Sequence, residues 1–327
     1  MEKRTVLVTG IGGNVGQGIL RNIISLNINI KIIGTGVEDF SGGNHLCDKY
    51  YKLAYSYDEK YISQILDVVK KEKIELIIPS TDFETYYLAK NRHLFSCPIA
   101  VSEERTCEIY LDKYLTYLHH QKHQIPFAKC VLPSDYKNEF KKCLAKPRKG
   151  RGSRGLIFNP ELSVINKLKD EEYLIQELFE GEEITTAFYV TKTKNILGQI
   201  TLNRTLIAGT TNNCFVEKKH DDRLLPMLLK ITEHSDIYGA ANLQSIVSKD
   251  GTIHPFEVNC RISGTNSIRS NFGFMDVKYT LQEYLLNEPL QPPVIIEGTA
   301  TRILMDVIYP KQNINSISNN SSDFFIF

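Results

Sequence analysis

The sequence predicts an α/β domain followed by a larger α+β region. Over residues 4–101, short apolar runs alternate with segments in which apolar residues recur every three or four positions. After residue 102, β-like segments joined by turn residues predominate. A chain of 327 residues is long enough for two or three domains.

The first part has the order of elements expected of a parallel sheet. Strands separated by helices of ordinary length pair in parallel, and the helices cover both faces of the sheet. Residues 1–101 are therefore predicted to form a Rossmann-like domain. The predicted strands are 6–9, 30–33, 76–79 and 98–101, and the predicted helices are 15–24, 62–69 and 83–92.

The second part is predicted to span residues 102–310 and to begin with two short helices. A loose tail rich in Asn and Ser is expected over 311–327. The predicted strands are 143–147, 153–158, 173–177, 184–191, 196–206, 239–248, 252–258 and 299–307, and the later helices are 224–234 and 275–286.

The charge balance argues against a polyanionic partner. Lys and Arg number 39 and Asp and Glu number 38, so no global field favours nucleic acid or an acidic membrane surface. No apolar run approaches the ~18 residues that a membrane span needs. Any bound anion must therefore be held by a local cluster of cations.

The seven cysteines are scattered and form no C-x-x-C pair, which disfavours a zinc site or a disulfide framework. Thr5–Thr9 is predicted to be a strand, with no signal peptide before it. A cytoplasmic location is therefore expected. His119, His120 and His123 are expected to form the solvated face of one helix.

A glycine-rich turn, Gly10–Gly16, joins the first strand to the first helix. Dinucleotide enzymes place G-x-G-x-x-G here, with an acidic residue further on for the ribose. The match is imperfect because Val15 stands at the third glycine position, and Glu38 and Asp39 are too far along the chain. A tight turn without a nucleotide is the favoured interpretation.

A second segment, Lys146–Gly155, combines cations with three glycines after a strand. Free backbone N–H groups and cations suit phosphate, so Lys146, Gly150, Gly152 and Ser153 are candidate phosphate-binding residues. The alternative is an exposed basic hairpin. The spacing is not that of a Walker A loop.

A third segment, Gln176-Glu177-Leu178-Phe179, leaves an apolar strand and enters a polar stretch. Its backbone groups could meet an adenine edge, and Glu183 could then reach ribose hydroxyls. The alternative is a strand-turn-strand with surface acids.

The most informative segment pairs Gln244 on one strand with Glu257, Asn259 and Arg261 on the next. Alternate strand residues face one side, so these groups are expected to project together, away from Val258. Side-chain oxygens of this kind suit Mg²⁺ that also holds phosphate, and Arg261 would then lie beside the transferring phosphoryl group. The alternative is a polar outer face of the sheet.

Two further segments give weaker indications of function. Ser263, Gly264 and Arg269 belong to a small-residue loop that could bind an acceptor carboxylate, as could Arg204 on an earlier strand. Thr81–Glu84 could face a ligand, but it fits a helix capping box better.

Taken in this order, the segments resemble the ATP-grasp superfamily, and in particular proteins like the large subunit of carbamoyl-phosphate synthase. The resemblance covers about residues 4–307. It implies a Rossmann-like pre-ATP-grasp domain that binds no dinucleotide, followed by an ATP-grasp fold of two subdomains, with the lid subdomain at about 125–180.

The resemblance also assigns roles to residues. Lys113, which follows Asp112, and Lys146 match the phosphate-binding lysines, and Lys146 and Arg261 would act in catalysis. The adenine hinge would be Gln176–Phe179, with Glu183 on the ribose. The metal ligands would be Gln244, Glu257 and Asn259, holding Mg²⁺, with two ions expected and Mn²⁺ able to substitute.

The chain holds one such unit and no recognisable amidotransferase segment. The resemblance therefore implies a ligase that activates a small carboxylate as an acylphosphate for attack by an amine or ammonia. Its partners would be small molecules, and the chain could also form a homo-oligomer. The alternatives are an NAD(P)-dependent reductase and a non-catalytic ATP-binding regulator.

Overall fold

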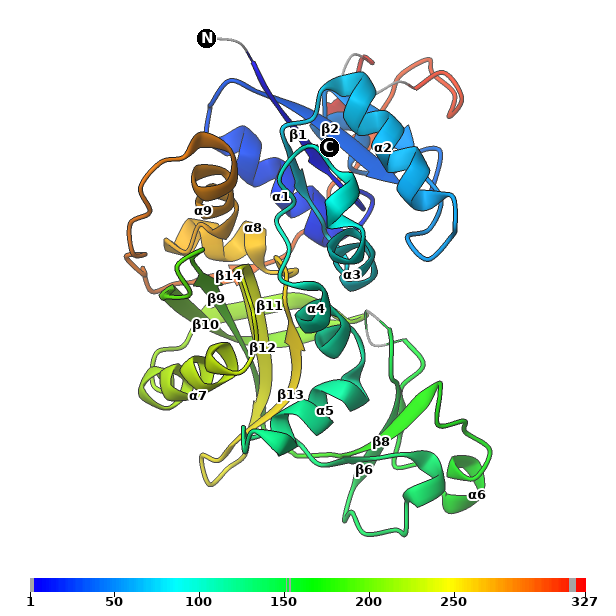
Figure 1. Cartoon of the computed structure of the whole chain (residues 1–327), viewed down its shortest axis with the longest axis vertical. Coiled ribbons are helices and arrows are strands. Elements are labelled where there is room, and N and C mark those ends of the chain that lie inside the picture. Colours follow the sequence, from blue (N-terminus) through cyan, green and yellow to red (C-terminus); the bar gives the residue numbers. More distant parts are fainter. Residues whose placement is uncertain (1–2, 151, 153, 318–321) are drawn as a thin grey trace.

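The computed structural model describes residues 3–150, 152, 154–317 and 322–327 (Figure 1). Its N-terminal part is a four-stranded parallel sheet in the order β3-β2-β1-β4, so the predicted Rossmann-like domain is confirmed. Its strands are β1 (Arg4–Val8), β2 (Ile30–Gly36), β3 (Lys49–Lys52) and β4 (Leu76–Ile78). Its helices are α1 (Asn14–Ser25), α2 (Tyr61–Glu72) and α3 (Asp82–Lys90).

The sheet is apolar on both faces, which explains the unbroken apolar runs of its strands. Leu7 belongs to one buried cluster, whereas its neighbours Val6 and Val8 belong to another. Because successive strand residues point to opposite faces, a strand covered by helices on both sides must be apolar throughout. The predicted strand at 98–101 is reduced to one parallel bridge between Ile77 and Ile99.

Helix α3 begins with the predicted capping box. The Thr81 hydroxyl accepts a hydrogen bond from the Glu84 backbone N–H at 3.2 Å and donates one to the Glu84 carboxylate at 2.8 Å. These bonds satisfy donors and acceptors at the first turn of the helix. The capping box therefore fixes the position of Asp82, the first helical residue.

The second part contains two antiparallel sheets, as an ATP-grasp fold requires. Six strands form a large sheet in the order β13-β12-β9-β10-β11-β14, and four form a small sheet in the order β5-β8-β6-β7. The large-sheet strands are β9 (Glu182–Val190), β10 (Ile196–Ile207), β11 (Thr210–Val216), β12 (Gly239–Val247), β13 (Ile253–Asn259) and β14 (Thr299–Thr301). The small-sheet strands are β5 (Cys130–Val131), β6 (Cys143–Pro147), β7 (Ile157–Phe158) and β8 (Tyr173–Glu177).

Short helices connect the sheets. Helix α6 lies with the small sheet, apart from the large sheet (Figure 1). The prediction missed β11 and the short strand β3, and the single strand expected at 299–307 is broken into two. The helices are α4 (Glu104–Leu111), α5 (Lys113–Lys122), α6 (Leu162–Ile165), α7 (Asp221–Glu233), α8 (Asn266–Arg269) and α9 (Asp276–Leu281), which continues as a π-helix over Gln282–Leu286.

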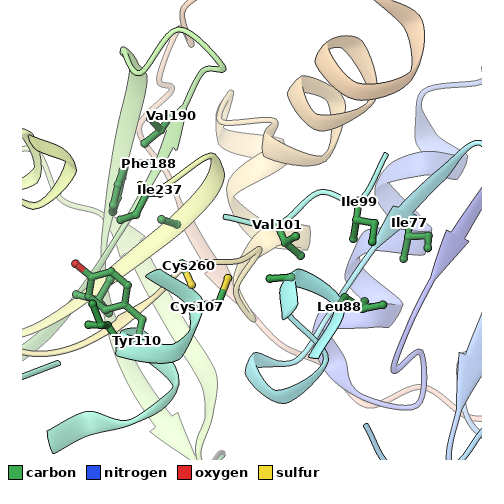
Figure 2. Close-up of a cluster of buried hydrophobic side chains, with 14 of the residues drawn as sticks. Ile77, Leu88, Ile99, Val101, Cys107, Tyr110, Phe188, Val190, Ile237 and Cys260 are labelled. Carbon is green, nitrogen blue, oxygen red and sulfur yellow. The ribbon is translucent and has the colours of Figure 1, made fainter. Parts of the chain in front are cut away.

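One buried cluster joins the two domains. It runs from Ile77 and Leu88 of the N-terminal domain, through Cys107 of α4, to Phe188 of the large sheet (Figure 2). The two domains therefore share apolar packing. No helix in the described part of the chain combines the length and the apolarity of a membrane span.

The prediction of a solvated histidine face is wrong for His120. This side chain is fully buried beside the Phe127 ring, and burial lowers the pKa of His120 to about 3. It is therefore neutral and acts as a core residue. The reason is that α5 packs against β13, which the sequence pattern of the helix did not reveal.

The C-terminal residues return to the N-terminal domain. Strands β15 (Val307–Ile308) and β16 (Phe325–Ile326) pair, and Phe324 packs against His45 of that domain. The expected loose tail therefore contains a strand, while 318–321 lie outside the described residues.

The capping box predicts a local stability effect. Thr81→Ala should lower the free energy of unfolding by about 1 kcal/mol because it removes the side-chain acceptor at the start of α3. Thr81→Ser retains the hydroxyl and should remain close to the wild type. Urea unfolding would measure both, and equal midpoints for Thr81→Ala and the wild type would contradict the assignment.

Candidate functional site

A cavity of about 440 Å³ lies between the small sheet and strands β12 and β13 of the large sheet. It collects side chains from segments that are far apart in sequence. Of the residues singled out from the sequence, those that line it are Lys113, Lys146, Gly150, Gly152, Gln176, Glu177, Leu178, Phe179, Glu183, Gln244 and Glu257. Ser153 lies outside the described residues.

Lys146 is the buried cation of the cavity. It lies on β6 with its side chain on the same face as Leu144, while Ala145 faces the core of the small sheet. The residue is 3% exposed, and its ammonium donates a hydrogen bond to the Phe256 carbonyl oxygen at 3.2 Å. Burial lowers the pKa of Lys146 to about 8, although Glu257 opposes the shift. A buried lysine of this kind favours the binding of an anion in the cavity.

Lys113 is positioned by its neighbour Asp112. The Asp112 carboxylate caps α5 by accepting the Tyr114 N–H at 2.9 Å, and it also accepts two donors of Arg148 at 2.8 and 3.2 Å. Arg148 belongs to the predicted phosphate loop, so one carboxylate holds both the helix and the loop. Lys113 itself donates to the Gly150 carbonyl oxygen at 3.3 Å. The Asp-Lys pair thus orders one side of the cavity.

Part of the cavity lining is apolar and aromatic. Phe179, at the predicted adenine hinge, stacks on His254 with ring centroids 3.6 Å apart and an angle of 10° between the planes. Leu178, Phe256 and Ala128 also line the cavity. Flat apolar surfaces beside strand-end backbone groups suit a planar heterocycle.

The predicted oxygen cluster, which consists of Gln244, Glu257 and Asn259, is brought together across β12 and β13. Gln244 lies directly opposite Glu257, and the Asn259 amide donates to the Glu257 carboxylate at 3.3 Å. Burial alone would raise the pKa of Glu257, but Lys113, Lys146 and Arg261 lower it. Glu257 is therefore a charged carboxylate in the buried part of the site.

A β-bulge adds residues that strict alternation does not predict. The register shifts between Gln244 and Ser245, so that Glu257 pairs with the first and Pro255 with the second. Phe256 is the extra residue, and it lines the cavity together with its neighbour Glu257. The sequence carries no signal for this bulge, which is why His254 and Phe256 were not predicted.

Arg261 lies beside the oxygen cluster, just beyond β13. It donates to the Asn259 side-chain oxygen at 2.5 Å and to the Asp82 carboxylate at 2.6 Å. Burial would lower the pKa of Arg261, but Asp82 raises it, so the guanidinium stays charged. Asp82 comes from the N-terminal domain, and sequence analysis assigned its segment only to the helix cap.

Arg204 lies on the other side of the oxygen cluster. It donates to the Glu183 carboxylate at 3.0 Å and to the Gln244 side-chain oxygen at 2.6 Å. Arg204 therefore links the predicted ribose acid to a predicted metal ligand. It therefore contacts two residues that line the cavity.

The small-residue loop after Arg261 is held by internal bonds. Arg269 is 0% exposed, pairs with Asp276, and donates to the Ser263 and Thr265 hydroxyls, both at 2.7 Å. The Gly264 carbonyl oxygen accepts from Arg302. Arg269 has no exposed surface for an acceptor, so its geometry fits a structural role.

The glycines of the N-terminal turn are explained by close packing. Gly10 has a φ of +59°, which favours glycine, and a side chain at Gly16 would lie 2.6 Å from the Gly10 carbonyl oxygen. Asp39, one of the candidate ribose acids, forms an exposed pair with Lys52. The turn therefore needs its glycines without any dinucleotide.

Comparison with known proteins agrees with this arrangement. Residues 6–100 match the PylC-like N-terminal domain, and residues 110–265 match the ATP-grasp domain. The chain therefore contains an ATP-grasp domain. The relation to carbamoyl-phosphate synthase holds at the level of the superfamily, and no curated protein matches the sequence.

Solved structures share the fold at low identity. The Staphylococcus aureus N5-carboxyaminoimidazole synthetase complexed with ADP has a TM-score of 0.75 and 10% identity, over 92% of this chain and 82% of that one. The Thermotoga maritima N5-carboxyaminoimidazole ribonucleotide synthetase has a TM-score of 0.69 and 16% identity, over 94% and 85%. The biotin carboxylase domain of the Hydrogenobacter thermophilus 2-oxoglutarate carboxylase has a TM-score of 0.70 and 15% identity, over 91% and 74%.

The environment of Arg269 predicts a large stability effect. Arg269→Met should lower the free energy of unfolding by about 3–5 kcal/mol because it leaves the buried Asp276 carboxylate without its partner. Arg105→Met removes an exposed pair with Glu108 and should change it by less than about 1 kcal/mol. Denaturant unfolding measures both. A stable Arg269→Met protein that binds ATP normally but loses turnover would instead support an acceptor role.

The depressed pKa of Lys146 predicts that ATP binding depends on pH. Lysine is charged below its pKa, so ATP affinity should fall as the pH rises through about 8. Near pH 8, binding should be accompanied by proton uptake, which calorimetry in buffers of different ionisation enthalpy measures. Lys146→Gln should bind more weakly and show a flatter profile. An identical pH profile for the variant would assign the effect to another group.

Proposed function

We propose that this protein is an ATP- and Mg²⁺-dependent ligase that activates a small carboxylate as an acylphosphate and joins it to an amine or ammonia. The proposal rests on one observation. Two lysines, Lys113 and Lys146, converge with Glu257 and Gln244 in a single cavity whose lining also includes aromatic side chains. This is a site for a purine nucleotide and its phosphates on a fold that supports phosphoryl transfer.

The nucleotide has one natural orientation in this cavity. The adenine would occupy the end formed by Phe179 and its neighbours, with Gln176–Phe179 supplying backbone groups and Glu183 reaching the ribose. The phosphates would then extend toward Lys113, Lys146 and the loop at Gly150 and Gly152. Oppositely charged groups would meet at the buried end of the cavity, where the low dielectric strengthens their attraction.

The oxygen donors fit Mg²⁺ if the phosphates complete its coordination. Glu257 would contribute a carboxylate on β13. Gln244 and Asn259 would contribute amide oxygens, which accept hydrogen bonds from Arg204 and Arg261 in this structure. In the described part of the chain, no group of three His, Cys, Asp or Glu side chains could hold a metal by itself. Magnesium commonly uses one or two carboxylates with substrate phosphates and water, so this sparse set suits it. Two ions, or Mn²⁺ instead, would fit the same chemistry. When bound, the ion would neutralise charge on the transferring phosphoryl group.

The reaction would proceed in two steps. A carboxylate oxygen attacks the γ-phosphorus and the bond to ADP breaks, which gives an acylphosphate. The amine then attacks the acyl carbon, and phosphate leaves with the oxygen that came from the carboxylate. Lys146 and Arg261 would stabilise the charge on the phosphoryl oxygens. Closure of the small sheet over the cavity would keep water from the acylphosphate.

The acceptor carboxylate would bind near Arg204, which contacts Gln244, and near the loop of Ser263 and Gly264 that follows Arg261. Bicarbonate is the first carboxylate to test, because the similar biotin carboxylase domain is described in complex with a bicarbonate anion. The cysteines are all free thiols, which agrees with a cytoplasmic enzyme.

Oxygen transfer tests the proposal directly. Carboxylates labelled with ¹⁸O, bicarbonate included, should be screened with ATP·Mg²⁺ and with ammonium or primary amines. An active carboxylate should increase ADP formation and place one ¹⁸O atom in the released phosphate, as measured by mass spectrometry. Turnover without label in the phosphate would mean hydrolysis by water, and absence of ATP binding would contradict the nucleotide site.

A variant separates the role of the oxygen cluster from that of the lysines. Glu257→Gln should weaken Mg²⁺ binding, so that raising Mg²⁺ partly restores turnover, because the amide keeps an oxygen but loses the charge. Lys146→Gln should not respond to Mg²⁺ in this way. Equal Mg²⁺ dependence in the wild type and in Glu257→Gln would remove Glu257 from the metal site.

A further inference from the structure

The N-terminal domain supplies one charged side chain to the reacting end of the site. Asp82 accepts a hydrogen bond from Arg261 at 2.6 Å, across 179 positions of sequence. We infer that Asp82 is a positioning residue for Arg261, through which the N-terminal domain takes part in phosphoryl transfer. This inference rests on the proposed function, and it adds a role that the ATP-grasp cavity alone does not require.

The donors of Arg261 show what the pairing achieves. Its Nη2 is shared between Asp82 and Asn259, and its Nη1 donates to the Ile262 carbonyl oxygen at 3.1 Å. Its Nε is buried and has no partner among the described residues. A buried N–H without an acceptor is costly. Nε and the second N–H of Nη1 are the donors that no described acceptor uses, and they are the ones left for a phosphoryl or acyl oxygen of the substrate.

The charge of Asp82 also determines which acid Arg261 approaches. Asp82 and Glu257 are the two carboxylates that act on the guanidinium. The Arg261 side chain is only 11% exposed, and its neighbour Asn259 is neutral. Without Asp82, the nearest negative charge to Arg261 would therefore be Glu257. An arginine drawn to Glu257 would compete with a metal ion for that carboxylate. Asp82 therefore keeps both groups available.

Both ends of the pair are held by independent anchors. The capping box at Thr81 fixes Asp82 at the start of α3. On the other side, the Asn266 amide donates to the Val15 carbonyl oxygen at 3.2 Å and accepts from Asn22 at 3.0 Å, which docks the loop after Arg261 onto α1. A pair held from both sides loses little freedom when it forms, unlike a flexible surface ion pair.

The experiment compares Asp82→Asn, Asp82→Ala and Asp82→Glu with Asp39→Ala, which removes an exposed ion pair with Lys52 in the same domain. Turnover is measured with ATP·Mg²⁺ and the carboxylate that is most active in the ¹⁸O screen. Asp82→Asn and Asp82→Ala should lower kcat by up to about 100-fold, because misplacing a reacting group by about 1 Å has this effect. ATP affinity should change by less than about twofold, since Asp82 is remote from the adenine and ribose. Asp82→Glu should recover part of the rate because it restores the charge.

A second measurement does not depend on turnover. Phenylglyoxal modifies accessible arginines, and peptide mass spectrometry reports the rate at Arg261. That rate should rise in Asp82→Ala and return toward the wild type in Asp82→Glu, with no change in Asp39→Ala.

Wild-type kcat and unchanged Arg261 labelling in Asp82→Asn and Asp82→Ala would overturn the inference. So would a loss of rate fully explained by lost ATP binding. If the wild type shows no carboxylate-dependent turnover, the proposed function is wrong. The rate of Arg261 labelling alone then tests whether Asp82 positions Arg261.

Discussion

Burial of positive charge around one carboxylate is the constraint on which the site depends. Lys113, Lys146 and Arg261 all lower the pKa of Glu257, and each comes from a different part of the fold. Helix α5 brings the first, strand β6 of the small sheet the second, and the end of β13 the third. Arg261 also pairs with Asp82, whereas Lys113 and Lys146 share the one carboxylate of Glu257, so the cavity that both lysines line is suited to a polyanion. Burial is the main cause of the lowered pKa of Lys146, and repulsion from Lys113 lowers it further.

The same arrangement explains why two β-sheets are needed. The small sheet has its own apolar core, which includes Tyr136, Ile165 and Ile175, whereas the large sheet shares a core with the N-terminal domain. A subdomain with an independent core can move as a body without exposing the main core. Lys146 belongs to that subdomain, while Glu257 belongs to the large sheet. The Lys146 ammonium would attract the phosphates directly, and Glu257 would attract them through an intervening Mg²⁺, so a nucleotide bound between the two sheets would draw them together.

The N-terminal domain has more than a supporting role. Its helix α1 packs against the loop that follows β13, since Gly18 of α1 lies against Asn266 and Asn14 of α1 lies against Gly264. The carboxyl edge of its sheet therefore faces the loop that follows β13, which is the position where open α/β sheets bind ligands. Here that edge contributes the Asp82 carboxylate to a site whose other residues belong to the second domain.

The fold class and most of the residues that line the cavity could be predicted from the sequence. Local patterns sufficed for this, because apolar periodicity defines strands such as β6 and β8, and alternation on β13 brings Glu257 and Asn259 to one face. The tertiary structure alone decided the β-bulge at Phe256, the burial of His120 and Arg269, and the pairing of Asp82 with Arg261. Each of these depends on what packs against a residue from a distant part of the chain. A capping box explains Thr81 and Glu84 within four residues, but the partner of Asp82 lies 179 positions away and is brought to it only by the docking of the two domains.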